Sequence, residues 1–168
     1  CFAPSFLAQG ESVLTGCLRS DDTQVMCEAV AALGAPIDVD DTTFRVSGVG
    51  PNFPPAEAPL YIGNSGTSAR FLTAVMTLGA GPVVIDGNPR MRERPISHLR
   101  DALEGLGARL EIEGDNDCPP VRVMGGGLPG GSVYMDASAS SQYVSAVLMV
   151  APYARQDVQI HFLGAIVS

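Results

Sequence analysis

The loop "YIGNSGTSARF" (residues 61–71) combines glycines and hydroxyl side chains between two apolar flanks. Gly63 and Gly66 allow a ligand to approach the backbone closely and allow positive φ angles. The hydroxyls at the expected start of a helix belong to Ser65, Thr67 and Ser68. A helix N-terminus has free N–H groups and the positive end of the helix dipole, which favour phosphate or carboxylate. The loop is therefore either a structural helix cap or an anion-binding site.

A second hydroxyl-rich helix start occurs in "DASASSQ" (residues 136–142). The segment that begins at residue 60 aligns with one that begins at residue 132, and the aromatic residues Phe71 and Tyr143 fall at equivalent positions. The polar side chains at this second start are Ser138, Ser140, Ser141 and Gln142. Two equivalent helix starts of this kind predict a shared polyanionic ligand.

The turn "NPRMRERP" (residues 88–95) carries Arg90, Arg92 and Arg94 just before a predicted helix. Guanidinium groups suit bidentate pairing with carboxylate or phosphate. One interpretation is a solvated turn in which Glu93 is an internal partner. Cations beside a helix start are unfavourable unless an anion compensates them, so we expect at least one of the three to bind a ligand.

The composition limits the chemistry that the chain can perform. All ten basic residues are arginines, so no lysine can act as a base or complete a P-loop. The formal net charge of −8 argues against binding to nucleic acid or anionic membranes. No apolar run approaches the ~20 residues of a membrane-spanning helix, so we expect a soluble protein. The four cysteines and two histidines lack metal-site spacing, so no metal site is predicted.

Internal repeats with a period of about 72 residues indicate that one supersecondary unit recurs along the chain. Its best-defined copy predicts the order β-α-β-α-β-β and hence an α+β fold. The expected elements are a strand at 59–62, a helix at 67–78, a strand at 83–85, a helix from 95 to 107, and strands at 108–112 and 119–123. The residues "SDDT" (20–23) are predicted to cap a further helix, with a catalytic carboxylate pair as the alternative.

The repeats divide the chain into parts of three units within a single partial domain. Residues 1–59 are predicted to hold the end of a first unit, 60–130 a complete second unit, and 131–168 the start of a third. The chain would then begin late in one unit and stop midway through another. We therefore expect a fragment of a longer protein, with a natural domain whose ends have diverged as the alternative.

Four segments together resemble the 5-enolpyruvylshikimate-3-phosphate (EPSP) synthase family. They are "SDDTQVM", "GNSGTSARF", "GNPRMRERPISHLRDAL" and "ASASSQYVSAVLMVAPYA". The resemblance implies repeated β-α-β-α-β-β units of the enolpyruvyl transferase fold, an inside-out α/β barrel, here incomplete at both ends. It also implies transfer of an enolpyruvyl group from phosphoenolpyruvate to shikimate 3-phosphate in aromatic amino acid biosynthesis, with neither a metal nor a cofactor.

The resemblance also implies roles for individual residues. Gly66 and Arg90 match family residues on the phosphoenolpyruvate side, and Asn64 and Thr67 flank the glycine. Gln142 matches a residue that contacts both substrates. The residues that match the shikimate 3-phosphate side are Ser140, Ser141 and Ser168. A glycine at position 66 is also expected to leave room for the inhibitor glyphosate.

Departures from the family pattern limit what this chain is expected to do alone. The family's "GSKS-x-S-N-R" stretch is absent, and so is the second domain, which carries the acid/base groups. Phe71 stands where many members have proline. We therefore expect no catalytic residue in this chain, no activity by it alone, and the remainder of the enzyme as its partner. UDP-N-acetylglucosamine enolpyruvyl transferase and a non-catalytic binding fragment are the alternatives. The compartment, cytoplasm or plastid, is not distinguished by the sequence.

Overall fold

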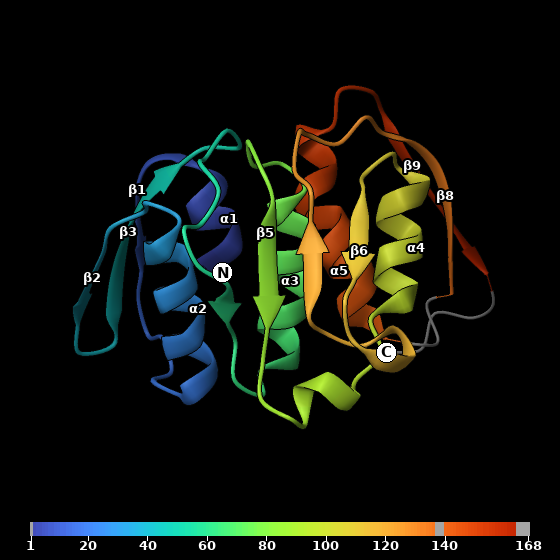
Figure 1. The fold of residues 1–168 in the computed structure, drawn as a ribbon. Coiled ribbons are helices and arrows are strands. Elements are labelled where there is room, and N and C mark those ends of the chain that lie inside the picture. Colours follow the sequence, from blue (N-terminus) through green and yellow to red (C-terminus); the bar gives the residue numbers. More distant parts are fainter. Residues whose placement is uncertain (1, 137–139, 164–168) are drawn as a thin grey trace.

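The computed structural model describes residues 2–136 and 140–163, which form three β-sheets and the helices that cover them. In Figure 1 the sheets follow one another across the view from β2 to β9. Behind the central sheet, helix α3 (Gly66–Met76) packs against helix α5 (Ser141–Val150). This mixture of helices and strands confirms the predicted α+β class.

The three sheets take their strands from successive parts of the chain. The first has the antiparallel order β1 (Gln9–Leu14), β3 (Thr43–Val49), β2 (Ile37–Asp40). The second has the order β4 (Leu60–Tyr61), β5 (Val83–Asp86), β7 (Val121–Val123), β6 (Leu110–Ile112), in which only β4 and β5 are parallel. The third pairs β8 (Gly131–Asp136) with β9 (Val158–Leu163) in parallel.

The elements between β4 and β7 follow the predicted order β-α-β-α-β-β, with helix α4 (Ser97–Gly105) as the second helix. The predicted helix bounds are wrong by one or two residues. Helix α3 begins at Gly66 because Ser65, not a later hydroxyl, is the N-cap. Helix α4 begins at Ser97 rather than at Pro95 because a separate 3₁₀ turn, η1 (Met91–Glu93), precedes it. Further short 3₁₀ turns are η2 (Asp115–Asp117) and η3 (Ala151–Tyr153).

Helix α2 (Asp21–Ala32) begins as the sequence predicts. The Ser20 side chain accepts a hydrogen bond from the Thr23 backbone N–H, and the Thr23 hydroxyl accepts one from the Ser20 backbone N–H. This capping box and the acidic first turn explain the "SDDT" residues as a structural start. Helix α1 (Phe2–Leu7) was not predicted, and its Phe6 ring packs edge-on against Phe53 at 4.8 Å.

The apolar faces of the helices form one core with the inner faces of the sheets. Leu72 and Val75 of α3 pack there with Leu99 and Leu103 of α4, all at most 1% exposed. Because this core fixes α3, α4 and α5 relative to one another, the residues at their N-terminal ends have defined positions. No helix in the described part of the chain is long and apolar enough to cross a membrane.

Candidate anion-binding site

The glycine-rich loop between β4 and α3 is fixed by a local cap and by the turn that follows β5. Ser65 is 3% exposed, and its hydroxyl oxygen accepts from the Ser68 backbone N–H at 3.2 Å. The carbonyl of Gly63, which has a φ of 56°, accepts from the Asn88 backbone N–H at 2.9 Å. This last bond holds the arginine-bearing turn beside the loop.

Two guanidinium groups converge on Gly66. A Cβ atom at Gly66 would lie 2.6 Å from Nη1 of Arg70 and 3.1 Å from Nη1 of Arg94. Arg70 Nη1 also donates a hydrogen bond to the Gly66 carbonyl at 2.8 Å. We call Gly66, Thr67, Arg70 and Arg94 the Gly66 site. Its geometry requires glycine because a side chain would occupy the space between the two cations.

The cations of the Gly66 site have no carboxylate partner among the described residues, unlike the neighbouring Arg92. Arg92 pairs with Asp86, whose carboxylate accepts from Arg92 Nε at 2.9 Å. That hydrogen bond lowers the pKa of Asp86 below its usual value, helped by the Gly87 backbone N–H. Arg70 and Arg94 form no such ion pair with any described residue, and Nε of Arg70 is buried without a hydrogen-bond acceptor in the described part of the chain. Two uncompensated guanidinium groups this close would favour an anion between them.

The second helix start lies against the first. The hydroxyl of Ser140 caps α5 by accepting from the Gln142 backbone N–H at 3.2 Å, and Ser141 is exposed in the first turn. The Gln142 side chain donates from Nε2 to the Thr67 hydroxyl at 3.1 Å. The structure therefore brings Ser140, Gln142, Thr67 and Gly66 together. Ser138 and Ser168 lie outside the described residues.

Arg90 and Asn64 are both exposed at the edge of this site. Arg90 precedes η1, and its side chain makes no hydrogen bond or ion pair with another described residue. Its role in ligand binding remains a prediction. The structure instead places Arg70 and Arg94 against Gly66. The sequence predictions omitted Arg70, although its spacing of four residues from Gly66 along a helix would have placed the two one turn apart.

An apolar hollow of about 490 Å³ adjoins the Thr67 side of the site. Thr67 and Phe71 line it from α3, Met26 from α2, Leu18 from the segment before α2, and Met149 from α5. Phe71 is half-buried there. Its ring therefore contributes to the apolar wall of this hollow rather than to the cationic part of the site.

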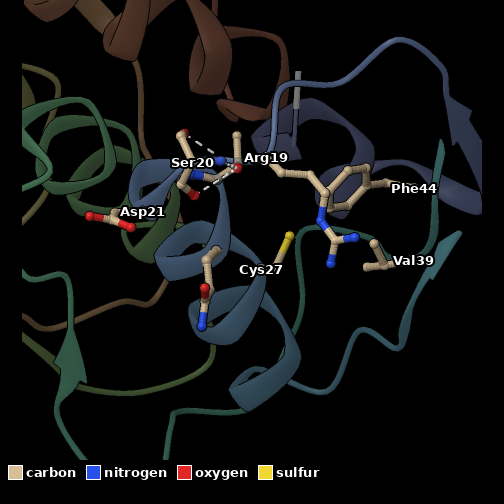
Figure 2. A pocket seen from close by; sticks show the side chains of 8 residues that line it. Arg19, Ser20, Asp21, Cys27, Val39 and Phe44 are labelled. Carbon is tan, nitrogen blue, oxygen red and sulfur yellow. Dashed lines mark hydrogen bonds between the residues drawn. The ribbon is translucent and has the colours of Figure 1, made fainter. Parts of the chain in front are cut away.

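A separate hollow of about 380 Å³ lies at the start of α2 (Figure 2). Figure 2 shows the Arg19 side chain extended beside Phe44 and Val39, with the Cys27 sulfur directed into the same space. Burial, followed by the nearby Cys17, raises the pKa of the Cys27 thiol to about 11. The described residues contain no cluster of three or more side chains that could hold a metal ion.

A family model described as EPSP synthase (3-phosphoshikimate 1-carboxyvinyltransferase) matches residues 4–168.

This chain belongs to the EPSP synthase family.

Curated relatives agree with this membership. The chain is 48% identical over 160 residues to 3-phosphoshikimate 1-carboxyvinyltransferase of Rhizobium etli (strain CIAT 652), an alignment that covers 94% of the chain and 37% of that relative. It is 46% identical over 165 residues to the enzyme of the same name from Serratia proteamaculans (strain 568), covering 96% of the chain and 38% of the relative. The resemblance to the EPSP synthase family seen in the sequence is thus confirmed.

A solved structure of EPSP synthase from Acinetobacter baumannii confirms the fold of the family. It superposes with a TM-score of 0.89 at 25% identity, covering 99% of this chain and 38% of that one. The chain therefore spans little more than a third of the length of these EPSP synthases.

Proposed function

We propose that this chain supplies part of the substrate-binding surface of an EPSP synthase. In this reaction an enolpyruvyl group passes from phosphoenolpyruvate to the 5-hydroxyl of shikimate 3-phosphate, and phosphate is released. The observation that carries the proposal is the pair of guanidinium groups, Arg70 and Arg94, that face Gly66 without a carboxylate partner in residues 2–136 and 140–163. Phosphoenolpyruvate, which carries both a phosphate and a carboxylate, supplies the missing negative charge.

Each of the two helix starts binds one of the two substrates. The Gly66 site and Arg90 hold phosphoenolpyruvate, with Asn64 in support. The first turn of α5 holds the phosphate of shikimate 3-phosphate through Ser140 and Ser141, together with Ser168. Gln142, whose amide reaches Thr67 at 3.1 Å, lies where both substrates would meet. When both substrates are bound side by side, their reacting groups no longer have to meet by diffusion. This lowers the entropic part of the activation free energy.

The chain provides binding but not the complete chemistry. Protonation of phosphoenolpyruvate at C3 and attack of the 5-hydroxyl at C2 require a proton donor and an acceptor. We assign these groups to the remainder of the enzyme, which is the partner of this chain. Among the described residues, Asp86 beside the site is already engaged by Arg92 and Gly87. The chain alone should therefore bind substrates without turning them over.

Calorimetric titration of the purified chain with shikimate 3-phosphate and with phosphoenolpyruvate tests this proposal. Ser141→Ala should weaken binding of shikimate 3-phosphate, and Arg90→Ala binding of phosphoenolpyruvate, each by about tenfold or more, because each loses a hydrogen bond to a charged group. Ser145→Ala and Arg109→Ala are matched controls, since both side chains are exposed without a described partner. Unchanged affinities in the first pair, or turnover by the purified chain without a partner, would contradict the proposal.

A further inference from the structure

Tyr143 lies beneath the Gly66 site and contacts both sides of it. Its side chain is 6% exposed in the first turn of α5. The ring lies under the Arg70 guanidinium, with Cζ 5.0 Å from the ring centroid, and the hydroxyl donates to the Pro95 carbonyl at 3.1 Å. The His98 ring packs against the same residue at 5.9 Å. One buried side chain therefore connects α3, α5 and the turn before α4.

The two arginines of the site need such support because their charges repel each other. Both Nη1 atoms lie close to the point where a Gly66 Cβ would be, at 2.6 Å for Arg70 and 3.1 Å for Arg94. No described carboxylate pairs with either group. Without restraint, two such flexible side chains would separate into solvent, because repulsion and side-chain entropy both favour it.

The Tyr143 ring restrains Arg70. A guanidinium over an aromatic face is attracted by the negative potential of the ring, most strongly where the pair is shielded from water. Tyr143 is almost fully buried, and Nε of Arg70 is buried as well. Together with the bond from Nη1 to the Gly66 carbonyl at 2.8 Å, the ring determines the direction in which Arg70 points.

The Tyr143 hydroxyl restrains Arg94 through the backbone. Arg94 immediately precedes Pro95, and a residue before proline is confined to extended conformations. Arg94 has a φ of −106° and a ψ of 108° in agreement with this. The hydrogen bond to the Pro95 carbonyl then fixes this extended segment to α5.

We propose that Tyr143 is a positioning residue that directs Arg70 and Arg94 toward the same anionic group. The ring acts on Arg70 and the hydroxyl on Arg94. The identity of the anion, phosphoenolpyruvate, rests on the proposed function, whereas the positions of the two side chains do not.

Three variants separate the two contacts. Tyr143→Phe removes the hydroxyl and keeps the ring, and Tyr143→Leu removes both. Tyr153→Phe is the matched control, because the Tyr153 hydroxyl also donates to a backbone carbonyl, that of Leu7 at 3.3 Å. The measurements are the NMR signals of the arginine side chains, the affinity of the chain for phosphoenolpyruvate, and the melting temperature.

In the native chain, ring current should shift the Arg70 side-chain protons to lower frequency than those of Arg109. Tyr143→Phe should keep this shift, change the Arg94 signals, and weaken phosphoenolpyruvate binding about three- to tenfold, with no greater loss of melting temperature than Tyr153→Phe. Tyr143→Leu should also abolish the Arg70 shift and weaken binding further. Tyr153→Phe should leave the Arg70 and Arg94 signals and the affinity unchanged.

Two results would overturn the positioning role. One is an Arg70 signal without a ring-current shift in the native chain. The other is that Tyr143→Phe changes the Arg94 signals, or the affinity for phosphoenolpyruvate, no more than Tyr153→Phe does. If the native chain does not bind phosphoenolpyruvate, the proposed function fails, and the Arg70 and Arg94 signals still decide the role of Tyr143 because they need no ligand.

Discussion

The amide of Gln142 donates a hydrogen bond to the hydroxyl of Thr67 at 3.1 Å, across a separation of 75 residues in the chain. This partly buried bond joins the N-terminal ends of α3 and α5. Two helix starts that resemble each other in sequence are therefore neighbours in space.

The bond between Gln142 and Thr67 should be measurable as a coupling energy. In a double-mutant cycle, Gln142→Ala and Thr67→Val should each lower the free energy of unfolding, and the double variant should lose about 1 kcal/mol less than the sum of the two. Urea denaturation provides the measurement. The pair Gln142→Ala and Ser145→Ala serves as a control, since Ser145 has no described partner. Additive losses in the first cycle would show that the bond contributes nothing.

Gly66→Ala should weaken anion binding while leaving the fold intact. The new methyl would lie 2.6 Å from Arg70 Nη1 and 3.1 Å from Arg94 Nη1, so both guanidinium groups would have to shift while the backbone stays in place. Gly66 is the first residue of α3, so the better helix propensity of alanine offsets only part of the cost of this shift. We therefore expect an unfolding free energy that changes by no more than about 1 kcal/mol, together with an affinity for phosphoenolpyruvate at least about tenfold weaker.

Gly81→Ala is the control for this substitution, because Gly81 lies away from the site, against Pro55. Calorimetric titration and thermal unfolding of both variants would check the expectation. A Gly66→Ala chain that binds phosphoenolpyruvate like the native chain would show that the space between the two guanidinium groups is not where the anion binds.

Asp86 should make the stability of the chain depend on pH in the acidic range. The hydrogen bond from Arg92 lowers the folded-state pKa of Asp86 from its usual value of 3.8. Its stabilising contribution is then complete above the unfolded-state pKa and is lost as the pH falls through the lower folded-state pKa. The Arg92 side chain is about half exposed, so we expect this contribution to be small.

Urea denaturation at a series of pH values, from neutral pH down to the folded-state pKa of Asp86, provides the measurement. As the pH falls, the unfolding free energy should decrease more steeply in the native chain than in Asp86→Asn. Asp38→Asn, which changes an exposed carboxylate on β2, is the control, and its unfolding free energy should depend on pH as that of the native chain does. If the unfolding free energy decreases equally steeply with falling pH in the native chain and in Asp86→Asn, the ion pair between Asp86 and Arg92 does not stabilise the fold as expected.

Cys27 should react slowly with alkylating reagents in the folded chain. Burial raises the pKa of its thiol to about 11, so little reactive thiolate is present at pH 8. Mass spectrometry after treatment with iodoacetamide should show much slower modification of Cys27 in the folded chain than in the same chain unfolded in urea. Equal rates in the two states would mean that the half-buried position of Cys27 beside the hollow does not suppress its reactivity.

Local sequence patterns predicted much of the fold because local interactions form it. The capping box of Ser20 and Thr23 starts α2 by contacts within one turn, and such contacts can be read from residue types alone. The bounds of α4 could not be predicted in this way. Its start at Ser97 follows from η1 and from the Pro95 carbonyl, which accepts a hydrogen bond from Tyr143, 48 residues further along the chain.

By itself, the sequence determined the α+β unit, the EPSP synthase family, and the two hydroxyl-rich helix starts, because residue spacing and turn residues encode these within a few positions. Only the tertiary structure decided which arginines face Gly66. The Arg70 guanidinium lies over the Tyr143 ring. Arg94 belongs to a turn that is bonded to the Gly63 carbonyl at Asn88 and to the Tyr143 hydroxyl at Pro95. A guanidinium lies at the end of a long flexible side chain, so its direction depends on contacts that the folded core supplies.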